Sequence, residues 1–334
     1  MVKRPNKLGK IKMLKERIIT ALILSLLIVS SLFLFTPVWF LIIFSIFILT
    51  GIWEWIDLCG VNNKVKYLLY FFNLIFISII LSEYLTLVHS GQINETLSNQ
   101  TSYVLHDNLN ILYFLFVLWF ISLIFWFLVA PIQIIFYQIR KKNLLPKSPL
   151  FNSLVGIFLL WGFWSITAVM ISGGLVGSVA YKYIIILPLL IVWGADIAAY
   201  FVGKKIGKRL LASNISPGKT WEGVMGGLIA GTSITLFLVY LLREIQHSLI
   251  INNPFFNLLN LITFKELLLL AFVTIIFSIL GDLYISIMKR EAGKKDSGKL
   301  FPGHGGVLDR IDSLMSAFVV YIFFLIIFYS NLTN

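Results

Sequence analysis

Apolar runs of about 20 residues, nearly free of charge, fill most of this 334-residue sequence. A helix of about 20 residues crosses the roughly 30 Å hydrocarbon core of a bilayer, where the backbone must satisfy its hydrogen bonds internally. The runs therefore predict an all-α protein, a polytopic integral membrane bundle of about nine transmembrane helices. They cover residues 18–36, 38–58, 67–87, 110–136, 149–171, 181–203, 222–242, 265–288 and 310–330.

Composition excludes several other classes of protein. With 59% hydrophobic and 13% charged residues, the chain is too apolar for a water-soluble fold of this length. Its single cysteine, Cys59, excludes an internal disulfide and a thiolate metal cluster. A net charge of +12 could attract nucleic acid in a soluble protein, but here the basic residues lie between the apolar runs. We therefore expect the lipid bilayer, and no nucleic acid, as a partner.

The basic residues also predict the orientation of the chain. If the N-terminus is cytoplasmic, 24 of the 27 Lys and Arg residues fall on the cytoplasmic side, and only Lys182, Arg243 and Lys265 fall outside. Such an asymmetry is typical of correctly oriented membrane proteins. We expect a cytoplasmic N-terminus, an external C-terminus and a location in a bacterial inner membrane, with the active site facing the cytoplasm.

These spans and loops divide the chain into three parts. Residues 1–17 form a basic cytoplasmic tail, which leads into a retained first span. Residues 18–148 form N-terminal transmembrane helices with a polar external loop at 88–110. Residues 149–334 form the C-terminal catalytic helices, with cytoplasmic loops at 204–221 and 289–306. Glycines at intervals of four predict close helix packing: Gly203 and Gly207, and Gly223, Gly227 and Gly231.

The stretch 282–312 concentrates charge between two apolar runs, where an ionised side chain is expensive to keep. Asp309 and Asp312 are three residues apart and share a helix face, and Asp282 ends the preceding span at a similar depth. Three carboxylates at one cytoplasmic helix interface are suited to Mg²⁺ or another divalent cation, which prefers oxygen ligands.

Cations surround these carboxylates and would repel a metal ion that arrived alone. Their expected role is to neutralise phosphates bound with the metal, which predicts a polyphosphate substrate. A glycine-rich turn around His304 frees the backbone amides of Gly305 and Gly306 to approach a ligand. The cations are Lys289, Arg290, Lys294, Lys295, Lys299 and Arg310.

The segment 213–223 ends like a phosphate-binding Walker A loop, but Ser213 stands where that motif needs its first glycine. We expect no strand before it, and we place Lys219, Thr220 and Glu222 in the first turn of the following span. A helix N-terminus with a lysine and a hydroxyl is a natural seat for phosphate. The alternative is a positively charged cytoplasmic loop without a ligand.

Three further carboxylates lie within spans. Glu54 and Asp57 share one face near the cytoplasmic end of the second span, where they could line a polar cavity or reach headgroup water. Asp196 lies deeper, and we expect it to face the interior of the bundle.

The residues of the two cytoplasmic loops resemble those of the phosphatidate cytidylyltransferases, also called CDP-diacylglycerol synthases. The resemblance extends to the 216–223 loop and the helix of Asp196, and weakens before residue 150. Two features depart from the family pattern: Ser297 stands where an aromatic residue is expected, and the 88–110 loop is long. The matching stretch reads Ser286-x-Met288-Lys289-Arg290-x4-Lys295-Asp296-x-Gly298-x2-Phe301-Pro302-x-His304-Gly305-Gly306-Val307-x-Asp309-Arg310-Ile311-Asp312.

The resemblance implies that CTP and phosphatidate react to give CDP-diacylglycerol and pyrophosphate, with a divalent metal held by Asp282, Asp309 and Asp312. Lys289 and Lys219 complete the expected catalytic set. Phosphatidate is mostly dianionic at neutral pH, so catalysis reduces to alignment and charge neutralisation. The expected contacts to nucleotide and phosphate are Ser216, Thr220, Ser286, Arg290, Lys295, Asp296, His304, Gly305, Gly306 and Arg310.

Other functions fit the sequence less well. A CTP-dependent lipid kinase is one alternative, and a CDP-alcohol phosphotransferase is disfavoured because it needs an Asp-Gly-x2-Ala-Arg motif that this chain lacks. A transporter of an anionic substrate would spread polar residues along several spans, whereas here they gather at one face. The sequence is compatible with a homodimer.

Overall fold

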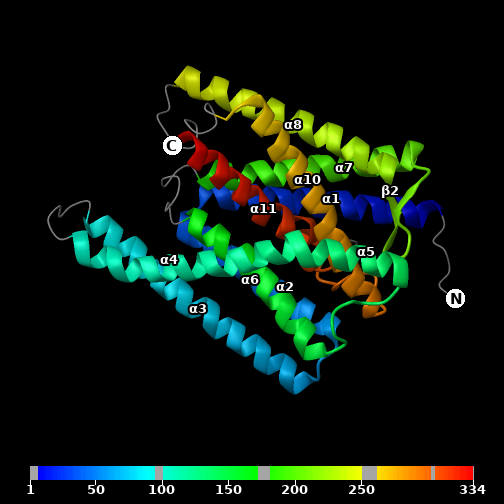
Figure 1. Ribbon diagram of the computed structural model, residues 1–334, viewed down its shortest axis with the longest axis horizontal. Helices are drawn as coiled ribbons and strands as arrows, with labels where there is room; N and C mark the ends of the chain where they lie inside the picture. Colours follow the sequence, from blue (N-terminus) through cyan, green and yellow to red (C-terminus); the bar gives the residue numbers. More distant parts are fainter. Residues whose placement is uncertain (1–6, 95–100, 172–180, 250–261, 302–304, 334) are drawn as a thin grey trace.

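The computed structural model describes residues 7–94, 101–171, 181–249, 262–301 and 305–333, which form a helical bundle (Figure 1). Eight helices in these ranges are long and apolar enough to cross a membrane, and α1 adds a shorter apolar segment, Leu22–Leu34. The predicted all-α membrane bundle is therefore confirmed. The helices are α1 (Lys7–Leu34), α2 (Pro37–Cys59), α3 (Asn63–Asn94), α4 (Thr101–Ile124), α5 (Ala130–Arg140), α6 (Pro149–Ile171), α7 (Tyr181–Ile206), α8 (Trp221–Leu249), α10 (Phe264–Glu291) and α11 (Leu308–Thr333).

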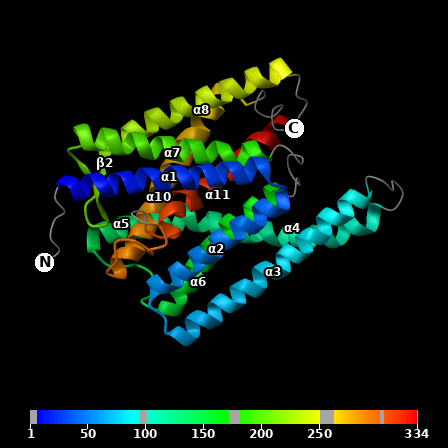
Figure 2. The same ribbon diagram turned by 180° about the vertical axis from the view of Figure 1, so that it is seen from behind.

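α1 and α7 lie side by side in both views, whereas α2, α3 and α6 are inclined to them, and the start of α1 and the end of α11 lie at opposite ends of the bundle (Figures 1 and 2). The start of α1 shares its end of the bundle with the only sheet among the described residues, a hairpin of β1 (Leu210–Ala212) and β2 (Ser216–Thr220).

Local sequence signals account for several helix boundaries. Pro37 starts α2, where a missing N–H has no cost, and Gly60 follows its end with a φ of 72°, a left-handed conformation that favours glycine. Thr263 and Glu266 form a reciprocal capping box at the start of α10. A π-helical turn, η1 (Phe125–Val129), joins α4 to α5 just before Pro131, whose ring removes one helical hydrogen bond.

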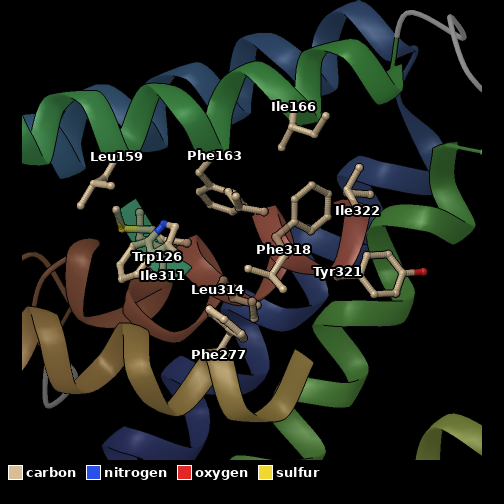
Figure 3. Close-up of a cluster of buried hydrophobic side chains, with 14 of the residues drawn as sticks. Trp126, Leu159, Phe163, Ile166, Phe277, Ile311, Leu314, Phe318, Tyr321 and Ile322 are labelled. Atoms are coloured by element: carbon tan, nitrogen blue, oxygen red, sulfur yellow. The ribbon is translucent and has the colours of Figure 1, made fainter. Parts of the chain in front are cut away.

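The core lies around α11, which is packed between α6 and α10 (Figure 3). Phe318 of α11 meets Phe163 of α6 edge to face, with ring centroids 5.5 Å apart, and Phe277 of α10 stacks obliquely on Phe127 at 4.6 Å. Because lipid tails are as apolar as these side chains, close packing rather than water exclusion holds such helices together. α11, which carries Asp309 and Asp312, is thus the central helix of the bundle.

The glycine repeats bring α7 and α8 into close contact, as the sequence predicted. A Cβ added to Gly223 would lie 2.8 Å from the carbonyl oxygen of Ala199, and one added to Gly227 would lie 2.9 Å from that of Ala195. Both distances are too short for a real carbon atom, so the helix backbones approach this closely only because glycine stands there.

Two expected loops differ from the structure. In the described part of the predicted 88–110 loop the chain is helical, because α3 continues to Asn94 and α4 begins at Thr101. The 204–221 segment contains the β1–β2 hairpin, so Lys219 and Thr220 lie on β2 and not in the first helical turn. Glu222 is in the first turn of α8, as predicted, and accepts hydrogen bonds from the amides of Lys208 and Arg209.

Gly227→Ala should destabilise the bundle by about 1 to 3 kcal/mol, because the added methyl group forces α7 and α8 apart. Thermal unfolding of the detergent-solubilised protein measures the change. Gly218→Ala is the matched control, since a Cβ at Gly218 meets no atom within 4 Å. Equal melting temperatures for the two variants would contradict the close contact of α7 and α8.

Candidate active site

A cavity of about 720 Å³ opens among α7, β2, α8, α10, α11 and the segment that joins α10 to α11. Nearly all the site residues predicted from the sequence and described in the structure line it. Gly305 and Gly306 do not line it, and His304 lies outside the described residues. The predicted residues that line the cavity are Ser216, Lys219, Thr220, Asp282, Ser286, Lys289, Arg290, Lys295, Asp296, Asp309, Arg310 and Asp312.

Lys219 reaches from β2 into this cavity and forms an ion pair with Asp282 of α10, with 2.5 Å between Nζ and Oδ2. Ser286, one turn further along α10, donates to the other oxygen of Asp282 at 3.2 Å. Partial burial lowers the pKa of Lys219, but the negative charges of Asp282 and Asp196 outweigh this effect and raise it above its ordinary value. Lys219 is therefore a cation held beside the cavity by carboxylates.

Lys289 joins α10 to α11 at the floor of the cavity. Its Nζ atom lies 2.9 Å from Oδ1 of Asp309 and 3.6 Å from Oδ2 of Asp312. Lys289 and Asp309 are both only 8% exposed, so each side chain neutralises a charge that would otherwise be buried alone.

The carboxylate of Asp309 is fully engaged by protein donors. Besides Lys289, it accepts hydrogen bonds from the amide of Ser297 at 2.7 Å, the hydroxyl of Ser297 at 3.0 Å and the amide of Gly306 at 3.0 Å. Asp309 thus holds Ser297 and Gly306 in place, and its predicted role as a metal ligand stays a prediction.

The described residues contain no group of three or more His, Cys, Asp and Glu side chains close enough to hold a metal ion. The predicted cluster of Asp282, Asp309 and Asp312 is therefore not formed as a three-carboxylate site, although all three line one cavity. Mg²⁺ in nucleotide sites needs only one or two carboxylates, with phosphate oxygens and water as its other ligands. Asp282 and Asp312 fit that requirement.

The tip of the β-hairpin is fixed from two sides, which sets the position of Lys219. Arg290 of α10 donates through Nε to the carbonyl of Ile215 at 3.0 Å. Gln138 of α5 accepts from the amide of Asn214 at 3.1 Å and from its side chain through the main-chain carbonyl at 2.7 Å. Sequence reasoning missed Gln138, because an isolated glutamine at a helix end is common and carries no signal of its own.

The three carboxylates within spans have different environments. Asp196 is exposed but lines the cavity, with the Ser313 hydroxyl 3.5 Å from its Oδ2, so it faces the cavity as expected and is not buried in the core of the bundle. Asp57 is 47% exposed and pairs with Lys66 at 2.7 Å and Lys294 at 2.9 Å, at the rim of the bundle. Glu54 is 6% exposed and faces the segment between α10 and α11, so it neither lines the cavity nor reaches headgroup water.

The fold and the cavity define an integral membrane protein with a polar site lined by paired lysines and carboxylates. The sequence profile described as the Cytidylyltransferase family matches residues 15–328, and the chain belongs to this family. It is 33% identical over 318 residues to the phosphatidate cytidylyltransferase of Haemophilus influenzae, covering 94% of this chain and all of the relative. Identity to the enzyme of the same name from Pseudomonas aeruginosa is 32%, over 92% of this chain and 96% of the relative.

Removal of Lys289 should strongly destabilise the protein. Lys289→Met leaves two carboxylates at the floor of the cavity without their cation, which costs about 3 to 5 kcal/mol in such pairs. Lys294→Met should cost about 1 kcal/mol or less, because its pair with Asp57 is largely exposed. Denaturant unfolding in detergent compares the two, and a small loss in Lys289→Met would contradict the role of Lys289 at the floor of the cavity.

Proposed function

We propose that this chain is a phosphatidate cytidylyltransferase, which converts CTP and phosphatidate to CDP-diacylglycerol and pyrophosphate. The observation that carries the proposal is the cavity in which Lys219 and Lys289 are held against Asp282 and Asp312. Similarity to two enzymes of that name over more than nine-tenths of the chain supports the same reaction. A site of this kind at the ends of membrane helices suits one soluble nucleotide and one substrate whose acyl chains stay in the bilayer.

The chemistry asks little of a general base. A phosphate oxygen of phosphatidate attacks the α-phosphorus of CTP, a new oxygen–phosphorus bond forms, and the bond to the β-phosphate oxygen breaks to release pyrophosphate. Because phosphatidate is already mostly dianionic at neutral pH, the protein mainly aligns the two substrates and neutralises their charge. Lys219, Lys289 and Arg290 are the side chains we assign to this neutralisation, with Lys295 and Arg310 at the rim.

The ion pairs of the cavity suggest how a triphosphate is received. Lys219 and Lys289 are each paired with carboxylates in this structure. An arriving phosphate can replace a carboxylate as the partner of either lysine, and the lysine then neutralises the negative charge of the phosphate. The carboxylates released in this exchange, Asp282 and Asp312, would then hold a Mg²⁺ ion together with phosphate oxygens and water. When bound, the ion would withdraw negative charge from the phosphates.

The positive charges and the bacterial relatives also support a location. We propose that the protein lies in a bacterial inner membrane with the cavity facing the cytoplasm, since 24 of 27 Lys and Arg residues then lie inside. In this orientation the cavity faces the cytoplasm, where CTP is available. A homodimer stays a prediction.

Labelled CTP should separate nucleotidyl transfer from the alternative lipid kinase. With purified protein and phosphatidate, label in the α-phosphate of CTP should enter the lipid, and label in the γ-phosphate should leave as pyrophosphate. A kinase would transfer the γ-phosphate to lipid and leave the α-label in CDP, so that result would refute the proposal.

The assignment of Asp282 and Asp312 as metal ligands predicts that their substitution lowers kcat much more than substitution of an aspartate outside the cavity. Asp282→Asn and Asp312→Asn should each lower kcat at least about 100-fold at saturating Mg²⁺, since each removes one carboxylate ligand. Asp57→Asn, at the rim of the bundle, is the matched control and should lose less than about threefold. Activity should disappear with a chelator and return with added Mg²⁺. Full activity in both cavity variants would exclude these side chains as metal ligands.

A further inference from the structure

Glu54 of α2 reaches into the segment that joins α10 to α11, more than 240 residues away in sequence. Its Oε1 accepts a hydrogen bond from the amide of Val307 at 3.0 Å, and its Oε2 accepts from the amide of Leu308 at 2.9 Å. These amides stand at the start of α11, where a negative charge is stabilised by the unpaired N–H groups. A carboxylate from one helix therefore caps the helix that carries Asp309 and Asp312.

The same carboxylate is tied to Asp309 through one side chain. The hydroxyl of Ser297 lies 2.7 Å from Oε2 of Glu54 and 3.0 Å from Oδ2 of Asp309. A hydroxyl has one proton to donate, so Ser297 donates to one of the two carboxylates at a time while it lies within hydrogen-bonding distance of both. This contact depends on the serine hydroxyl at position 297.

Two glycines make room for Glu54. A Cβ added to Gly298 or Gly306 would overlap the Glu54 carboxylate, closer than any real contact. Both glycines lie in the segment between α10 and α11, which therefore folds directly around this side chain. Glu54, Ser297 and Asp309 are 6%, 4% and 8% exposed, so the arrangement is shielded from water.

We propose that Glu54 is a positioning residue for the transfer reaction. It does not line the cavity, and acts by fixing Ser297 and the start of α11 at Val307 and Leu308. The first turn of α11 in turn carries Asp309, Arg310 and Asp312. This inference rests on the proposed function for its catalytic consequence, but the hold of Glu54 on the segment is independent of the reaction.

The first experiment measures kcat and KM in folded protein. Glu54→Gln keeps the shape of the side chain but turns an amide nitrogen toward one of the two backbone N–H groups. We expect kcat to fall about 10- to 100-fold, because small displacements of aligned groups are costly, while the KM for CTP stays within about threefold. Glu266→Gln is the matched control: it alters a glutamate that caps α10 at the end remote from the cavity, and should leave kcat unchanged.

Ser297→Ala provides a second variant that removes only the bridging hydroxyl. It should lower kcat about 3- to 10-fold alone, and by a smaller factor in the Glu54→Gln background, because the two side chains act through the same contact. If Glu54→Gln yields no folded protein, Ser297→Ala decides the matter. A kcat within twofold of wild type in the folded fraction of either variant would make the role of Glu54 purely structural and overturn the proposal.

A measurement of spin-label mobility, which does not depend on catalytic turnover, tests this inference separately from the proposed function. A spin label at Lys299→Cys, an exposed position in the segment, in a Cys59→Ala background, should become more mobile in Glu54→Gln and stay unchanged in Glu266→Gln. Wild-type protein that makes no CDP-diacylglycerol would refute the proposed function, whereas unchanged label mobility in Glu54→Gln would refute the hold of Glu54 on the segment.

Discussion

The site depends on keeping opposite charges paired at the ends of membrane helices. A lone ion removed from water pays a solvation penalty of several kcal/mol even after the protein relaxes, and a well-placed partner recovers much of it. In this chain Lys289 lies between Asp309 and Asp312, and Lys219 pairs with Asp282, so each of these charges in the cavity has a partner of opposite sign. The conformations of α10, α11 and the β-hairpin near the cavity follow from these pairs.

Paired charges have a consequence for ligand binding. A cavity lined with free lysines would attract any anion, whereas one in which each lysine already has a carboxylate favours a ligand that brings its own counter-ion. A nucleotide with Mg²⁺ meets this condition, because its phosphates suit the lysines and its metal suits the carboxylates. Asp309 also accepts hydrogen bonds from the amides of Ser297 and Gly306, so moving its carboxylate away would leave two backbone amides unsatisfied.

The sequence predicts some levels of this structure better than others. The spans follow from hydropathy because a bilayer leaves few alternatives to a helix of the right length, and the residues lining the cavity follow from the density of charge between 282 and 312. The partners of each charge could not be predicted in the same way. Nothing local in the sequence distinguishes Asp309, which is bound by protein donors, from Asp282 and Asp312. Nor does the local sequence show that Glu54 contacts Ser297. Such pairs are set by how helices distant in sequence pack together.

The same reasoning explains the two segments that differ from expectation. Polar residues at 88–94 and 101–110 are compatible with a helix once they lie beyond the apolar part of a span, so composition alone misplaces the ends of α3 and α4. The β-hairpin is too short for a period-two pattern to be recognised, and a Ser-Pro pair reads equally well as a helix start.

α2 connects the N-terminal half of the chain to the catalytic half. Trp55 is fully buried, donates through its indole nitrogen to the carbonyl of Asn152 at 2.8 Å, and fills the space left by Gly156 of α6. On the same helix, Glu54 holds the start of α11 and Asp57 pairs with Lys294. The boundary near residue 148 therefore separates two stretches of sequence but not two independent structures, because residues between α10 and α11 pack around a side chain from the first half.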